Sequence, residues 1–205
     1  MFENVVVPKP WGYEYLVYEN DEVGIWYLNI EYNKQTSLHA HPNKKTGLII
    51  LSGVAEISFL NHKFKLTPPD KTMIRHGVFH STKAVSKQGL EVLEIETPKN
   101  KQDLIRLEDG YGRAGQPYED ASCYQQDYTF NTLCDKDSII LGDCQLNKED
   151  SLCIGEYHTS VITHGGITAR KYSVLAPGDI VDQSTLIRLS DKFDVCPSKI
   201  IGVDY

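Results

Sequence analysis

Short apolar runs separated by turn residues recur along the first half of the chain. These runs are rich in β-branched and aromatic residues, and they predict strands. The predicted strands span residues 24–32, 46–53, 54–60, 62–68, 71–77 and 89–98. Turn residues such as Ser52-Gly53 and Pro68-Pro69-Asp70 separate them. A strand about every ten residues, without a helical period between strands, favours an all-β sandwich or barrel.

The second half carries a weaker version of the same pattern. Glycine, proline and charged residues gather at 110–120, which favours a boundary near 115–120. We therefore expect one domain at 1–118 and a β-rich part at 119–205. Short strands of this second part are expected within 138–144, 160–166, 167–181 and 184–193. The pattern leaves open whether this part is a partial second barrel or an extension packed on the first.

Composition narrows the class of protein. The chain has 205 residues, of which 40% are hydrophobic and 24% charged, as in ordinary globular proteins. Its net charge of −7 argues against a nucleic-acid partner, although a few local basic residues can still hold an anionic substrate. We find no signal-peptide pattern and no bilayer-length apolar stretch, so we expect a cytoplasmic protein without membrane contact. Five cysteines without a CxxC pair are expected to be reduced thiols.

Two histidines, His39 and His41, precede a predicted strand. Residues two apart in a strand face the same side, roughly 6 to 7 Å apart, so both imidazoles can approach one metal ion. His80 follows Gly77, which permits a tight turn, and can supply a third ligand. Three neutral imidazoles suit one divalent ion of zinc, manganese, iron or nickel. The alternative is that these histidines are surface or structural residues.

The spacing of these residues resembles the two sequence motifs of the cupin family. His39, His41 and Gly53 keep the register of the first motif, and Gly77 and His80 keep that of the second. The resemblance implies a jelly-roll barrel, here followed by a β-rich C-terminal extension, with the three histidines as metal ligands. Among the cupins, three-histidine sites also occur in thiol dioxygenases, which implies a rival chemistry.

Two further segments narrow the resemblance within the cupins. The segment 9–16 (KPWGYEYL) resembles the opening of the type II mannose-6-phosphate isomerase domain, which also occurs fused to mannose-1-phosphate guanylyltransferases. The segment 103–113 (DLIRLEDGYGR) resembles that domain's closing motif. The resemblance covers about residues 7–118. It implies a metal-dependent isomerase or epimerase that acts on a sugar phosphate or nucleotide sugar in surface-polysaccharide biosynthesis.

This chain departs from the family pattern near the predicted metal site. Thr46 stands where the family has a glutamate ligand, and Arg75 stands where proline is usual. Three histidines with water or substrate would then complete the coordination, which leaves an open position for Lewis-acid catalysis. The loss of the acid keeps two other functions open. They are a three-histidine iron dioxygenase and a non-catalytic sugar-binding or regulatory cupin.

Basic residues near the motifs are the candidates for substrate chemistry, which needs proton transfer and charge stabilisation. The candidate catalytic residues are Lys45, Arg75 and Arg106. The candidate substrate-binding residues are Lys44, Thr46 and Arg113. Arg106 and Arg113 are carried over from the closing motif of the family. Each basic residue could instead be a solvated surface charge, and Arg106 could pair with Glu108 or Asp109.

Two acidic residues offer a replacement for the missing glutamate. Glu94 and Glu96 alternate with Leu93 and Ile95, so both glutamates share one face of a strand. On the inner face, one of them could supply the acid. We expect the outer, solvent face, because polar residues of an alternating strand usually point outward.

Barrels of this kind leave strand edges and an apolar outer face, which favours association with a second copy. We therefore expect a homodimer, with the aromatic-rich residues 1–20 crossing to the neighbour. The other expected partner is a small carbohydrate.

Overall fold

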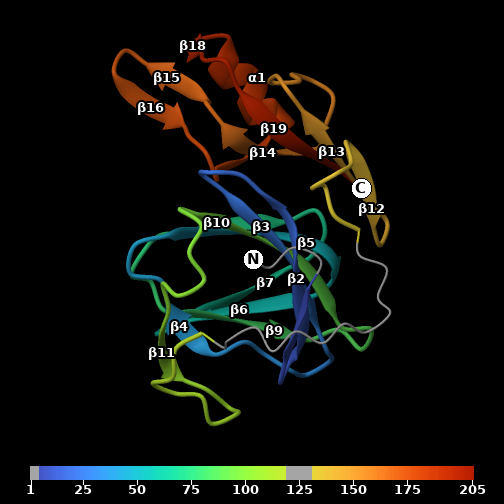
Figure 1. Cartoon of the computed structure of the whole chain (residues 1–205), viewed down its shortest axis with the longest axis vertical. Coiled ribbons are helices and arrows are strands. Elements are labelled where there is room, and N and C mark those ends of the chain that lie inside the picture. Colours follow the sequence, from blue (N-terminus) through green and yellow to red (C-terminus); the bar gives the residue numbers. More distant parts are fainter. Residues whose placement is uncertain (1–4, 119–130) are drawn as a thin grey trace.

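The computed structural model describes residues 5–118 and 131–205, and these residues form antiparallel sheets with one short helix (Figure 1). The predicted all-β class is therefore confirmed. The expected boundary between residues 118 and 119 adjoins residues 119–130, which lie outside the described residues together with Cys123.

Two antiparallel sheets build the N-terminal barrel. The six-stranded sheet consists, in spatial order, of β1 (Val6–Lys9), β2 (Gly12–Glu19), β3 (Gly24–Ile30), β10 (Leu90–Thr97), β5 (Lys45–Gly53) and β8 (Lys71–Ile74). The five-stranded sheet consists of β11 (Ile105–Glu108), β4 (Leu38–Ala40), β9 (His80–Ala84), β6 (Ala55–Phe59) and β7 (Lys63–Leu66). Trp11, Leu28, Ile50, Ile57 and Val92 are among the residues of the core between them. This arrangement confirms the predicted cupin jelly roll.

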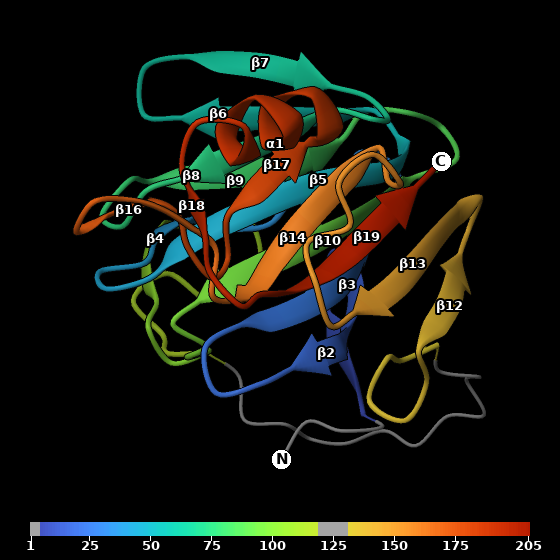
Figure 2. The same cartoon turned by 90° about the horizontal axis from the view of Figure 1, so that it is seen from above.

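The C-terminal part covers the outer face of the six-stranded sheet. Its larger sheet consists of β12 (Ser138–Leu141), β13 (Cys144–Glu149), β19 (Lys199–Asp204), β14 (Thr159–His164) and β17 (Ile180–Asp182). Its smaller sheet consists of β16 (Tyr172–Leu175), β15 (Ile167–Ala169) and β18 (Asp194–Val195). Figure 2 shows β14 and β19 crossing above β10 and β3. A second apolar core joins the two parts, with Tyr15, Ile49 and Leu93 packed with Leu146 and Val203.

This second core explains the continuous apolar run in β5. Ile49 and Leu51 belong to the core under the C-terminal sheet, whereas Leu48 and Ile50 belong to the core inside the barrel. A strand that is covered on both faces needs apolar residues at successive positions rather than at alternate ones. The run at 48–51 is thus typical of a central strand between two layers.

One predicted strand of the C-terminal part is wrong. Residues 184–193 were expected to be extended, but α1 (Gln183–Ser190) occupies most of this segment. The side chain of Asp182 accepts a hydrogen bond from the Thr185 amide, which caps the first turn. Leu186 is buried, and Leu189 packs against the same apolar cluster three residues later, which is a helical spacing.

The N-terminal strands, which were expected to cross to a neighbour in a homodimer, pair within this chain. β1 and β2 pair with each other, and β2 pairs with β3 of the same chain, so residues 6–19 lie in this chain's own sheet. The apolar outer face that was expected to attract a neighbour is covered by the C-terminal sheet.

Cys144, Cys153 and Cys196 are free thiols. Within the described ranges, α1 is too short to traverse a lipid bilayer, and no other helix does so.

Candidate metal centre

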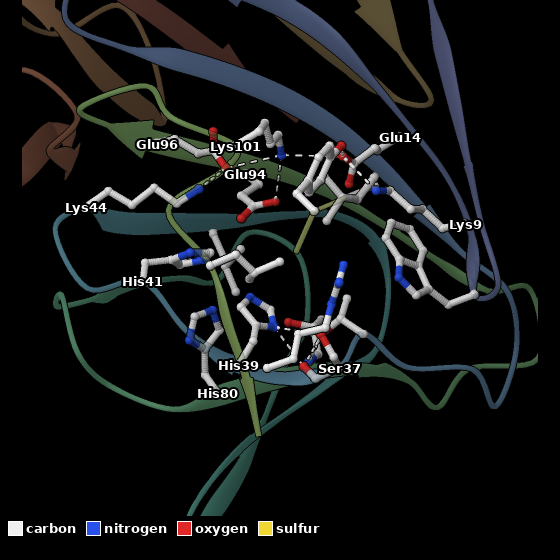
Figure 3. A pocket seen from close by; sticks show the side chains of 18 of the residues that line it. Lys9, Glu14, Ser37, His39, His41, Lys44, His80, Glu94, Glu96 and Lys101 are labelled. Atoms are coloured by element: carbon white, nitrogen blue, oxygen red, sulfur yellow. Dashed lines mark hydrogen bonds and ion pairs between the residues drawn. The ribbon is translucent and has the colours of Figure 1, made fainter. Parts of the chain in front are cut away.

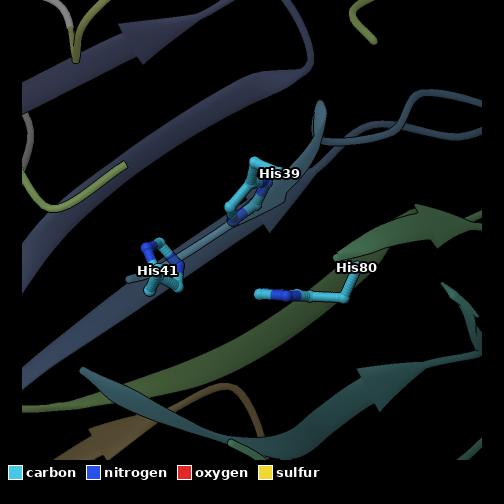
Figure 4. A group of neighbouring side chains, drawn as sticks. All are labelled: His39, His41 and His80. Atoms are coloured by element: carbon cyan, nitrogen blue, oxygen red, sulfur yellow. The ribbon is translucent and has the colours of Figure 1, made fainter. Parts of the chain in front are cut away.

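Three histidines from two neighbouring strands meet inside the barrel. His39 lies in β4, and His41 is the first residue after this strand. His80 begins β9, which pairs with β4 at His39. The ring centroids are 4.8 Å apart for His39 and His41, 4.5 Å for His39 and His80, and 5.4 Å for His41 and His80. One ring nitrogen of each lies within 4.8 Å of the other two (Figure 4). The structure thus brings together the three predicted ligands.

Main-chain carbonyls determine which nitrogen of each ring faces the centre. The Nδ1 atoms of His39, His41 and His80 lie 2.8, 2.7 and 3.0 Å from the carbonyl oxygens of Ser37, Asp103 and Val78. A carbonyl oxygen only accepts, so each Nδ1–H donates and each Nε2 keeps its lone pair. The Nε2 atom of His41 is buried without a hydrogen-bond partner among the described residues. This donor set fits a divalent metal ion.

The surroundings keep the three rings neutral. Burial is the largest cause that lowers the pKa of each histidine, to about 3 for His41. The neighbouring charge of Lys44 acts in the same direction on all three rings. Neutral imidazole is the form that binds a metal ion, so the rings are prepared as ligands at neutral pH.

Asp103 fixes the loop that carries His41. Its carboxylate accepts hydrogen bonds from the amide of Asn43 at 2.8 Å and the amide of Lys44 at 3.0 Å. It also accepts one from the side chain of Asn43 at 2.8 Å. Because the carbonyl of the same residue accepts from His41 Nδ1, Asp103 both holds the loop and orients the ring.

Charged side chains line the rest of the cavity (Figure 3). The basic ones are Lys9, Lys44, Lys101, Arg106 and Arg113, and the acidic ones are Glu14, Glu94 and Glu96. This surplus of positive charge favours an anionic ligand. The cavity measures about 60 Å³. A single water molecule needs about 10–15 Å³ by the same measure, so the cavity has room for several small groups.

The segment that follows β11 covers this cavity. Arg106 donates a hydrogen bond to the carbonyl of Gln116 at 2.9 Å, and the hydroxyl of Tyr118 donates one to Glu14. Arg113 pairs with Asp109 at 2.7 Å in the turn between them. These contacts hold residues 113–118 beside the cavity, which Arg113 and Tyr118 line.

Comparison with known proteins identifies the family of this barrel. Residues 3–109 match the family model described as mannose-6-phosphate isomerase C-terminal, which is more than half of the chain. The chain belongs to this family. The resemblance inferred from the sequence motifs is thereby confirmed.

Relatives in this family are much longer than the matched region. The mannose-1-phosphate guanylyltransferase of Klebsiella pneumoniae is 28% identical over 107 residues, which cover 51% of this chain and 23% of the relative. The alginate biosynthesis protein AlgA of Pseudomonas putida is 28% identical over 119 residues, which cover 55% and 24%. The chain therefore spans only about a quarter of these relatives' lengths.

One solved structure that is similar to this chain is that of an uncharacterised conserved protein with a double-stranded β-helix domain from Klebsiella pneumoniae subsp. pneumoniae. It is 15% identical to this chain, with a TM-score of 0.44, and the match covers 52% of this chain and 88% of that one.

The position of the two glutamates of β10 differs from the one expected from the sequence. Glu94 and Glu96 were expected on the solvent face, but they line the cavity and are buried. The opposite face of β10 carries Leu93 and Ile95, which pack under the C-terminal sheet. With both faces of the strand covered, the polar positions point toward the charged cavity and the apolar ones point away from it.

The other predicted site residues divide into two groups. Lys44, Arg106 and Arg113 line the cavity. Lys45 points to the other side of β5 and pairs with Asp179 at 2.5 Å, and Arg75 is exposed in the loop between β8 and β9.

Thr46, the departure from the family pattern, lies on β5 directly opposite Glu96. It is fully buried and its hydroxyl has no hydrogen-bond partner in the described part of the chain. It is not one of the cavity-lining residues. Thr46 therefore shares the inward face of the sheet with Leu48 and Glu96 and lies beside one of the acids of the cavity.

Lys101 is the main site residue that sequence reasoning missed. Its amino group lies 3.5 Å from Glu14, 3.2 Å from Glu96 and 4.0 Å from the ring centroid of Trp26. Burial alone would lower the pKa of Lys101, but the nearby glutamates outweigh burial and raise it above its usual value. No sequence signal marks this residue, because it lies in a polar turn after β10 that reads as an ordinary loop.

Proposed function

We propose that this protein binds one divalent metal ion and acts as an isomerase or epimerase on a sugar phosphate or nucleotide sugar in surface-polysaccharide biosynthesis. The observation that carries the proposal is the histidine group, in which one ring nitrogen of each residue lies within 4.8 Å of the other two, in a cavity with a surplus of basic side chains. Membership of the family supports the substrate class. The names of two relatives, alginate biosynthesis protein AlgA and xanthan biosynthesis protein XanB, support the polysaccharide setting.

The chain's own residues supply binding and charge. A bound divalent ion would supply Lewis-acid polarisation of an oxygen atom. Lys44, Arg106 and Arg113 give the cavity the positive charge that an anionic phosphate group requires. Arg106 also holds residues 113–118 beside the cavity through its hydrogen bond to Gln116. We expect this hydrogen bond to change when an anionic ligand binds to Arg106.

Metal analysis by mass spectrometry tests the first part of the proposal. Wild-type protein is expected to contain one divalent ion per chain, and a His41→Ala variant is expected to contain none. The matched control is His62→Ala, because His62 is an exposed residue of the β6–β7 hairpin, stacked on Phe59. Unchanged metal content in His41→Ala would contradict the proposal.

A ligand screen against sugar phosphates and nucleotide sugars tests the second part. Turnover followed by NMR would identify the isomerase or epimerase reaction and its substrate. Binding without turnover would instead indicate a sugar-binding or regulatory protein. Bound iron together with oxygen consumption would indicate a dioxygenase.

The proposed working state is a cytoplasmic homodimer. Edge strand β11 supports association, because Ile105 and Leu107 on it are 54% and 48% exposed. Sedimentation at micromolar concentration is expected to give twice the mass of the chain, and Ile105→Lys is expected to give a monomer. A wild-type protein that sediments only as a monomer would contradict the proposal.

A further inference from the structure

The three acids of the cavity differ in how far their charge is already neutralised. Glu96 lies 2.6 Å from Lys44 and 3.2 Å from Lys101, so two buried ammonium groups share its carboxylate. Glu14 accepts a hydrogen bond from Tyr118 and lies 3.5 Å from Lys101. Both carboxylates are therefore committed to groups of the chain itself.

The carboxylate of Glu94 has weaker polar contacts than those of Glu14 and Glu96. Its one polar contact in the described ranges is with Lys101 at 3.7 Å, which is longer than a hydrogen bond. Its side chain is only 11% exposed, so water replaces this missing partner poorly. A buried carboxylate with unused acceptor capacity is costly unless a further positive group satisfies it.

The position of Glu94 directs it to the histidine group. It lies on β10, opposite Leu48 of β5, and faces the inside of the barrel. Figure 3 shows Glu94 extending into the cavity between Lys101 and the three histidines. Burial lowers the pKa of His80, whereas the hydrogen bond to Val78 and the charge of Glu94 act in the opposite direction, so Glu94 acts on this ring electrostatically.

A nearby acid would stabilise a divalent ion at this centre. Three neutral imidazoles cancel none of its double charge, and Lys44 is buried nearby. Thr46, which lies opposite Glu96, supplies only a neutral hydroxyl. The charge of Glu96 acts on His41 as that of Glu94 acts on His80, but two lysines already share the Glu96 carboxylate. Glu94 is therefore the least committed acid of the cavity lining.

We propose that Glu94 is the acidic group of the metal centre and balances part of the charge of the ion that His39, His41 and His80 hold. This inference rests on the metal site of the proposed function, and it is independent of which sugar the protein uses.

Zinc affinity, measured by competition with a chelator, tests the inference on the full chain. Glu94→Gln removes the charge with little change in shape, and the zinc dissociation constant is expected to rise by about 10- to 100-fold. Glu91→Gln is the matched control, since Glu91 lies on the same strand but its carboxylate approaches Gly142 under the C-terminal sheet. This control is expected to bind zinc as the wild type does.

A second variant separates charge from general disturbance. Glu94→Asp keeps the negative charge, so it is expected to bind zinc more tightly than Glu94→Gln, with thermal melting as the check that each variant is folded. Equal zinc affinity of Glu94→Gln and wild type would overturn the inference while the histidine site stands. If wild type binds no zinc, manganese or iron, the inference and the metal part of the proposed function both fall.

Discussion

Replacement of Asp103 by alanine is expected to disturb both the stability of the protein and its metal centre. Asp103 accepts hydrogen bonds from the amides of Asn43 and Lys44 through its carboxylate, and its carbonyl accepts from His41. The substitution removes the carboxylate but not the carbonyl. The loop between β4 and β5 then loses the carboxylate that fixes it. The main-chain carbonyl of residue 103 can still accept a hydrogen bond from His41.

The expected magnitude follows from which donors stay unsatisfied. The amide of Lys44 is buried, and leaving such a donor without an acceptor costs about 1–3 kcal/mol. Asn43 is exposed, so water can replace the carboxylate there at little cost. We therefore expect the free energy of unfolding to fall by about 1–3 kcal/mol. Zinc affinity should fall by about 10- to 100-fold, as for other groups that orient a ligand.

The stability difference should depend on pH. Burial alone would raise the pKa of Asp103, but hydrogen bonds from Asn43 and Lys44 outweigh it and lower the pKa. A carboxylate with a lowered pKa stabilises the folded state above its unfolded value, about 3.9, and this contribution is lost as the pH falls through the folded value. Wild type and Asp103→Ala should therefore differ most near neutral pH and converge in acid.

Urea unfolding at several pH values and chelator competition measure the two effects. Asp70→Ala is the matched control, because Asp70 also accepts a backbone hydrogen bond, from Thr67, but in an exposed turn away from the cavity. The control should lose stability without losing zinc affinity. If Asp103→Ala keeps wild-type zinc affinity despite the loss of stability, the Asp103 carboxylate does not hold the loop of His41 in place for the metal and the reasoning is refuted.

Three further changes probe other parts of the structure. Thr46→Glu should bind zinc more tightly than wild type in chelator competition, because it adds a negative charge beside the cavity; unchanged affinity would show that position 46 does not influence the ion. Lys45→Ala should leave zinc affinity unchanged and cost at most about 1 kcal/mol in urea unfolding, because its pair with Asp179 is partly exposed. Gly178→Ala should destabilise by more than about 1 kcal/mol, because φ is +83° and a Cβ would lie 1.8 Å from Thr97 Oγ1; wild-type stability would contradict this geometry.

Sequence patterns predicted β3, β5, β6, β7, β8 and β10 of the barrel and missed β1, β2, β4, β9 and β11. β3, β5 and β10 were predicted because seven to nine residues of apolar or β-branched character lie between clear turns. β4 has only three residues, too few for a period to be recognised, whereas β2 was missed although it has eight. The helix at 183–190 was missed because its capping residue, Asp182, lies before the segment whose apolar content suggested a strand.

The candidate metal centre could be predicted only as far as local spacing reaches. His39 and His41 share a face because of the period of a strand, and Gly77 places His80 at a turn. The meeting of His39 with His80 depends on the pairing of β4 with β9, which is a long-range contact. Lys101 enters the cavity only because its loop folds over the barrel, and nothing in its immediate sequence indicates that position.

The position of the C-terminal sheet explains why the glutamates of β10 could not be placed from the sequence, and it also explains how the barrel holds them. Leu93 and Ile95 suggest an inner face, but they pack outward, together with Ile180, in the core shared with the C-terminal sheet. Burial of these apolar side chains stabilises the layered sheet by about 25 cal/mol for each Å² removed from water. That gain offsets the desolvation cost of burying Glu94 and Glu96 on the other face. The extension thus lets the barrel interior carry charge instead of a complete apolar core, and the proposed metal-dependent site for an anionic sugar requires such a charged interior.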